Sequence, residues 1–98
     1  MPFLIETFDK PDSLALRQQH RPAHLDFLRE NAAALLACGA KLSDDGETAS
    51  GSIYIVDVET RAEAEAFLAL DPFSQVELPG EVRITRWRKV VLDGKAFI

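Results

Sequence analysis

Two side chains of this sequence, His24 and Asp71, have the chemistry of an acid–base pair. An unperturbed imidazole titrates near pH 6.5, so a histidine can accept or donate a proton at neutral pH. A carboxylate that accepts a hydrogen bond from one imidazole nitrogen fixes the tautomer and leaves the other nitrogen free as a base. One interpretation of the two residues is therefore a His24–Asp71 pair that moves a proton.

Each residue also has a purely structural interpretation, which the sequence leaves open. His24 could simply pack at the edge of the core or donate a hydrogen bond to a carbonyl group. Asp71 stands directly before Pro72, and aspartate before proline is a common arrangement at the start of a helix. The two interpretations of Asp71 are compatible, because a carboxylate has two oxygens.

The element that positions His24 is expected to be helical from about Ser13 to Cys38. Pro22 removes one backbone donor, which predicts a kink or two short helices that meet near residues 20–22. An apolar stripe with helical spacing follows: Leu25, Leu28, Ala32, Leu35 and Leu36. In helical projection His24 flanks this stripe, and Arg21 lies within about 60° of His24.

The other elements complete an alternating pattern. Strands are expected over residues 3–8, 40–43 and 51–58 and from Glu81 onward. Thr60 and Glu63 match a capping box at the start of a helix that ends at Asp71. The order βαββαβ predicts an α+β fold, a ferredoxin-like sandwich formed by one domain, residues 1–98. One face of such a sheet has no helices, so we expect a homodimer that pairs two of these faces.

Composition excludes several classes of function. The net charge is −5, from 16 acidic and 11 basic residues, which argues against nucleic acid as a partner. No signal peptide and no apolar stretch of membrane-spanning length is visible, so we expect a cytoplasmic protein that does not bind membranes. The two histidines and the single Cys38 lack metal-ligand spacing, and Cys38 is expected to be a small buried side chain. No metal and no cofactor are expected.

Several segments together match a known pattern in order and spacing. They are Phe3-Leu4-Ile5, residues 9–14, Arg17, Arg21-Pro22-Ala23-His24-Leu25, Gly39, Gly51-Ser52, Asp71-Pro72-Phe73 and Trp87-Arg88-Lys89-Val90. Over nearly the whole chain they resemble the YCII-related (YciI-like) proteins. One departure is that family members often have Gly-Pro after the first long helix, where this chain has Gly39-Ala40. The loop beside the site is therefore expected to have a different shape.

The resemblance implies a dimeric α+β barrel of ferredoxin-like shape, related to the muconolactone isomerases. It also implies a site around the matching histidine and aspartate, here His24 and Asp71. Further residues near that site or contributing to it would be Arg17, Arg21, Ser52 and Ser74. Some relatives remove chloride from aromatic substrates.

Three hypotheses for function follow. The first is a lyase or isomerase that transfers a proton in an aromatic or carboxylate-bearing small molecule: His24 moves the proton, Asp71 orients its ring, and Arg21 or Arg17 holds an anionic group. The second is a non-catalytic dimeric module that binds a small ligand or a partner protein through the same pocket. The third is a purely structural dimer, which a large distance between His24 and Asp71 would favour.

Overall fold

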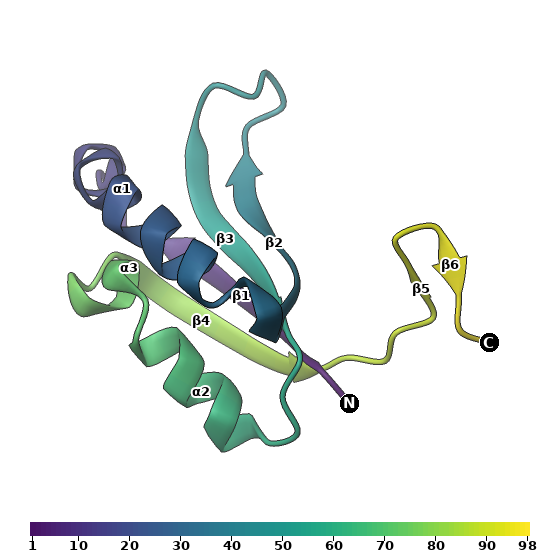
Figure 1. Ribbon diagram of the computed structural model, residues 1–98. Coiled ribbons are helices and arrows are strands. Elements are labelled where there is room, and N and C mark those ends of the chain that lie inside the picture. Colours follow the sequence, from purple (N-terminus) through teal and green to yellow (C-terminus); the bar gives the residue numbers. More distant parts are fainter.

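The computed structural model describes residues 1–98 and contains an antiparallel four-stranded sheet with helices on one face (Figure 1). The strand order is β2-β3-β1-β4, formed by β1 (Phe3–Asp9), β2 (Leu35–Leu42), β3 (Ala49–Val56) and β4 (Pro79–Arg86). The helical elements are α1 (Leu14–Glu30), the 3₁₀ turn η1 (Ala32–Ala34), α2 (Arg61–Ala69) and α3 (Pro72–Gln75). The predicted ferredoxin-like α+β fold is confirmed.

The central strand β1 shows why the sheet has a core side. Its residues alternate, so Phe3, Ile5 and Thr7 point toward the helices and are at most 2% exposed. Ile5 lies opposite Tyr54 of β3 on that side. The core comprises Phe3, Ile5, Tyr54, Val56, Ala64 and Leu68. Because β3 and β4 both pair with β1, this layer fixes the surface against which α1 and α2 pack.

The prediction of a helix up to Cys38 is wrong for the residues after Glu30. Helix α1 ends at Glu30, where the backbone N–H of Asn31 donates to the carbonyl of Phe27. After the turn η1, the chain forms β2 and pairs with β3 from Leu35 to Leu42. Local helix preference in this alanine- and leucine-rich stretch is a weak effect. The backbone ladder with β3 outweighs it.

Pro22 does not divide α1, so the expectation of two short helices is also wrong. Its side chain is exposed, and the helix continues through it although its missing N–H leaves one backbone hydrogen bond unformed. The strand expected from Glu81 onward is β4, which begins at Pro79 and ends at Arg86. Its register with β1 shifts between Phe8 and Asp9.

The connection from α2 to α3 positions Asp71. The capping box at the start of α2 is confirmed, because Thr60 and Glu63 exchange hydrogen bonds between side chain and backbone. After α2 the chain turns into extended geometry at Asp71, the N-cap of α3. Helix α3 packs against α1, so the Asp71 carboxylate is brought beneath the middle of α1 with no surface exposed to solvent.

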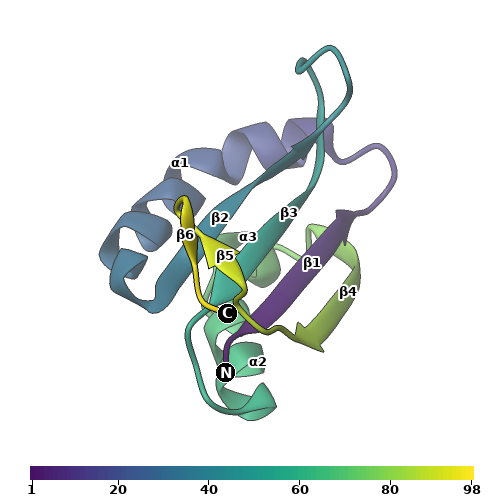
Figure 2. The same cartoon turned by 90° about the vertical axis from the view of Figure 1, so that its right-hand side faces the viewer.

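The opposite face of the sheet has no helix over it (Figure 2). We call this surface the open face; it comprises Leu4, Glu6, Phe8, Ile53, Ile55, Arg83 and Thr85. The C-terminal residues 88–98, here called the C-terminal arm, form a small hairpin of β5 (Val91–Leu92) and β6 (Lys95–Ala96) on that side (Figures 1 and 2). No helix is long and apolar enough to cross a membrane.

Candidate functional site

The structure brings His24 and Asp71 into direct contact. Nδ1 of His24 lies 2.8 Å from Oδ1 and 2.9 Å from Oδ2 of Asp71. His24 is 6% exposed and Asp71 is fully buried. The sequence placed His24 at the margin of an apolar stripe, whereas the packing of α3 against α1 covers it further. A hydrogen bond of this kind is expected to fix Nδ1 as the protonated nitrogen and leave Nε2 as the basic one.

Asp71 accepts two more hydrogen bonds. The hydroxyl of Tyr54 donates to Oδ2 over 2.6 Å, and the backbone N–H of Phe73 donates to Oδ1 over 2.9 Å. Both interpretations of Asp71 therefore hold: the carboxylate caps α3 and also contacts His24. Burial, the Asp71 charge and this hydrogen bond raise the pKa of Tyr54 far above its usual value, so its hydroxyl remains a donor.

Tyr54 is a member of this cluster that the sequence did not predict. The apolar run of the strand expected over residues 51–58 was a signal for it, because a tyrosine in a buried strand needs a partner for its hydroxyl. The partner itself could not be identified, since Asp71 reaches Tyr54 through the packing of α3.

Aromatic contacts hold the His24 ring in place. It stacks on Phe73 with ring centroids 3.9 Å apart and planes 14° from parallel, and it meets the edge of Tyr54 at 6.3 Å. Nε2 of His24 has no hydrogen-bond partner in the chain. The sole buried side-chain nitrogen or oxygen without a partner is Oδ1 of Asp9, so Nε2 keeps accessible surface. One nitrogen of a rigidly held imidazole is thus available to a guest molecule.

His24 lines a cavity of about 180 Å³ between α1, β2 and α3. Its walls are formed by Arg17, Arg21, His24, Leu25, Leu28, Cys38, Gly39, Ala40 and Phe73. An apolar cavity of about 150 Å³ holds a benzene molecule in other proteins. The cavity therefore has room for one six-membered ring beside the imidazole.

The charge of Arg17 is already matched inside the protein. Its Nη1 donates to Oδ2 of Asp9 over 2.9 Å, its Nη2 donates to the Ser52 hydroxyl over 3.1 Å, and the whole residue is 5% exposed. The guanidinium also lies 4.8 Å from the centre of the Phe73 ring. Arg17 thus ties β1 and β3 to the aromatic ring on which His24 stacks.

The other residues that the sequence placed near the site are distributed unequally. Arg21 is exposed, has no ion-pair partner and lines the cavity. Ser52 is 1% exposed, and its hydroxyl faces Arg17. Ser74 is half-buried on α3. Neither serine lines the cavity, so Arg21 is the charged group in this set that a ligand could neutralise.

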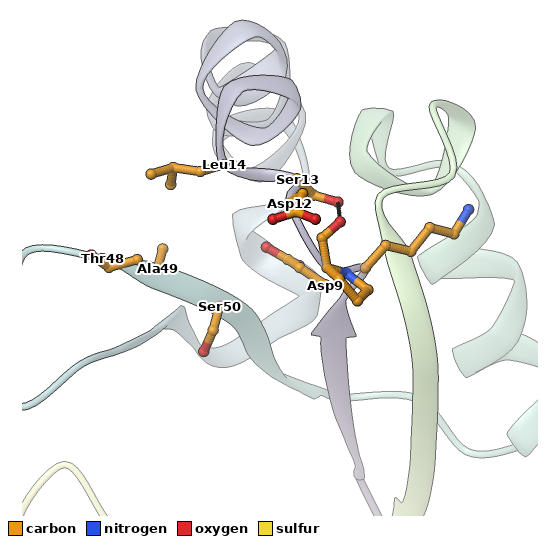
Figure 3. Close-up of a pocket in the computed structure, with 9 residues that line it drawn as sticks. Asp9, Asp12, Ser13, Leu14, Thr48, Ala49 and Ser50 are labelled. Carbon is orange, nitrogen blue, oxygen red and sulfur yellow. Dashed lines mark hydrogen bonds between the residues drawn. The ribbon is translucent and has the colours of Figure 1, made fainter.

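A separate pocket of about 280 Å³ lies at the start of α1 (Figure 3). In Figure 3 the residues from the end of β1 to the start of α1, Asp9, Asp12, Ser13 and Leu14, face Thr48, Ala49 and Ser50 across it. This pocket has no lining residue in common with the cavity at His24. The chain contains no group of three or more histidine, cysteine or acidic side chains that could hold a metal ion.

Cys38 is exposed, so the burial expected for it is wrong. The residue belongs to β2, an edge strand, where one side of the strand has no neighbour. Desolvation at the cavity wall and the negative charge of Asp71 raise the pKa of the Cys38 thiol to about 11. The thiol is therefore protonated at neutral pH, and we assign it no nucleophilic role, because the thiolate is the reactive form.

The class defined by this fold and site is a ferredoxin-like α+β protein with a buried histidine–aspartate contact beside a ring-sized cavity. The YCII-related domain family matches residues 1–88, and the chain belongs to this family. The predicted resemblance is confirmed, and the last ten residues lie outside the matched region. No curated protein matches the chain.

Solved structures that are similar to it include the following two. The first is 5-chloro-2-hydroxyhydroquinone dehydrochlorinase from Burkholderia phenoliruptrix in complex with 2,5-dihydroxybenzoquinone, with a TM-score of 0.82 and 32% identity over 90% of this chain and 94% of that one. The second is a candidate antibiotic biosynthesis monooxygenase from Bacteroides thetaiotaomicron, with a TM-score of 0.58 and 11% identity over 97% of this chain and 93% of that one. The second likeness concerns the fold alone.

Proposed function

We propose that this protein is a small-molecule enzyme of the lyase or isomerase type that transfers a proton through His24. The observation that carries the proposal is the buried contact between His24 and Asp71, with Nε2 accessible beside a ring-sized cavity. A carboxylate–imidazole pair of this geometry is suited to general acid–base catalysis. The 32% identical dehydrochlorinase acts on a six-membered ring, which supports the same class of substrate here. The alternative of a purely structural role loses the support that a large distance between the two residues would have given it.

In the proposed reaction, Nε2 of His24 accepts a proton from an acidic hydroxyl or C–H group of the bound ring. The electron pair left behind moves into the ring. In an elimination it expels a leaving group as an anion, and the imidazolium then releases its proton to solvent. In an isomerisation the imidazolium returns the proton to a different ring atom. The Asp71 carboxylate lies against Nδ1 and stabilises the imidazolium that forms between these steps. No cofactor takes part.

Arg21 holds the anionic group of the substrate in this proposal. It is the cavity-lining cation without an internal partner, whereas the charge of Arg17 is matched by Asp9. Arg17 and Ser52 act indirectly, because they hold the strands and the Phe73 ring against which His24 stacks. Ser74 is assigned no contact with the substrate.

The test is turnover by the His24→Gln variant. With hydroxyquinones and their chlorinated hydroquinone precursors as substrates, we expect kcat to fall by about 10²–10⁴-fold, the usual contribution of general acid–base catalysis. The His20→Gln variant is the matched control, because His20 is on the same helix but does not line the cavity. Release of the leaving anion and the ring absorbance report the reaction.

Two outcomes would reject catalysis by His24. Equal turnover by the wild type and the His24→Gln variant excludes the proton transfer. Tight binding of these compounds without any turnover favours the alternative, a non-catalytic dimeric module that binds a ligand or a partner protein through this cavity.

The proposal includes a homodimer, formed through the open face and the C-terminal arm. The arm lies on the side of the open face (Figure 2) and exposes apolar side chains: Val90 is 42% exposed, Val91 59%, Phe97 49% and Ile98 100%. Charge complementarity favours a second copy as the partner. The arm, residues 88–98, contains three basic and one acidic side chain, whereas residues 1–87 contain eight basic and 15 acidic ones. The basic arm of one chain is attracted to the acidic body of another.

We expect the wild-type chain to sediment as a dimer at micromolar concentration. The Phe97→Asp variant should raise the dimer dissociation constant by about thirtyfold, the effect of losing ~2 kcal/mol from an aromatic anchor. Leu70→Asp is the control, because Leu70 is 62% exposed at the end of α2, in the helical layer. A monomeric wild type, or equal effects of the two substitutions, would contradict this arrangement.

A further inference from the structure

A larger and more open apolar hollow, here called the apolar compartment, adjoins the cavity at His24. This compartment has a volume of about 350 Å³ and shares Leu25, Leu28 and Cys38 with the cavity. Its remaining walls are formed by Arg29, Ala32, Leu35 and Ala37, so six of the seven lining residues are hydrophobic. The single charged wall residue, Arg29, is paired with Asp26 over 2.8 Å. The compartment therefore offers apolar surface and no unmatched charge.

The opposite end of the cavity carries the unpaired cation. Arg21 lines the His24 cavity and also a compartment of about 390 Å³ with mixed polar and apolar walls, between α1 and the β2–β3 hairpin. Along α1 the order is Arg21, His24 and then Leu25 with Leu28, a spacing that places them on one side of a helix. Seven residues of helix correspond to roughly 10 Å. A ligand that spans Arg21 and the apolar compartment is thus longer than one ring.

From this arrangement, with a cation at one end and apolar surface at the other, we propose that the ligand of the site is an elongated amphipathic anion. Its anionic group meets Arg21, its reacting atoms lie at His24, and an apolar part larger than a single ring extends toward Ala32. This inference deepens the proposed function and rests on the same cavity. It adds that the substrate is larger than one ring, because the cavity alone accommodates one ring and the adjoining compartment accommodates a further apolar group.

The test compares the binding of benzoate and 2-naphthoate to the full chain by calorimetry. These carboxylates carry the same anionic group and differ by one fused ring, and they do not react with thiols as quinones do. We expect 2-naphthoate to bind about tenfold more tightly, because its second ring buries additional apolar surface. The Arg21→Gln variant should weaken both compounds by a similar factor.

Ala32 and Ala33 provide a matched pair of variants. Both are exposed alanines of η1, but only Ala32 lines the apolar compartment. Ala32→Glu places a carboxylate in that compartment and should remove the tenfold advantage of 2-naphthoate while benzoate binding is unchanged. Ala33→Glu should alter neither. If Ala32→Glu fails to fold, Ala32→Trp, which fills the compartment, is expected to give the same loss.

Equal affinities for the two compounds in the wild type would overturn the inference, as would unchanged 2-naphthoate binding in both Ala32 variants. Failure here is distinguishable from failure of the proposed function, because binding is measured without turnover. A chain that prefers 2-naphthoate but catalyses no proton transfer keeps this inference and loses the proposed reaction. A chain with His24-dependent turnover and no preference loses this inference alone.

Discussion

The Asp71→Asn variant is expected to lose about 10²–10⁴-fold in kcat and about 3 kcal/mol in the free energy of unfolding. The carboxylate is fully buried and accepts hydrogen bonds from Tyr54 and Phe73 while it contacts Nδ1 of His24. An amide has one acceptor oxygen, so its NH₂ group must face at least one former donor. Breaking one partner out of a buried charged network typically costs 3–5 kcal/mol. The loss of kcat follows because the imidazole is no longer held in the reactive tautomer.

Urea unfolding measures the change in the free energy of unfolding, and steady-state kinetics measures the change in kcat. The control is Asp57→Asn, an exposed aspartate directly after β3, which should change both quantities little. Asp71→Asn with wild-type stability would show that the hydrogen bonds around Asp71 contribute little to folding. Wild-type kcat in that variant would show that Asp71 does not orient His24.

Local sequence patterns predict the local features of the site better than its long-range contacts. The N-cap role of Asp71 was predictable, because the Asp-Pro pair is a local signal that needs no tertiary partner. The contact between His24 and Asp71 spans 47 positions and followed from a hypothesis about chemistry, supported by a resemblance. The cover that α3 provides over His24, and the participation of Tyr54, arise only when α1 packs on α3.

The stretch from Ala32 to Cys38 shows why the rest could not be predicted. Its alanines and leucines favour a helix locally, and the spacing of Leu28, Ala32 and Leu35 continues the stripe of α1. Pairing with β3 is a long-range interaction that no local pattern reports. The error mattered for the site, because β2 carries Cys38, Gly39 and Ala40 into the wall of the cavity.

Gly51→Ala is expected to destabilise the chain by about 3 kcal/mol or more, although the added group is a single methyl. Gly51 is buried in β3, opposite Phe8 of β1. A Cβ atom at this position would overlap the backbone carbonyl oxygen of Thr7 and lie 2.6 Å from Cε of Lys41. The lysine side chain can move, but the carbonyl belongs to the β1–β3 ladder and cannot retreat without breaking it. Overpacking of this kind typically costs 1–3 kcal/mol, and rigid backbone places this case at the upper end.

Gly39→Ala, on the neighbouring strand β2, is the matched control. Gly39 lies on β2 opposite Ile53, only two ladder positions from the Lys41–Gly51 pair, and a Cβ added there meets nothing within 4 Å. We therefore expect the Gly39 variant to unfold at a urea concentration close to that of the wild type, while the Gly51 variant unfolds at a much lower one. Similar midpoints for the two variants would mean that β1 and β3 can separate at Gly51. In that case the Arg17–Ser52 hydrogen bond next to it could not hold Phe73 and His24 in fixed positions.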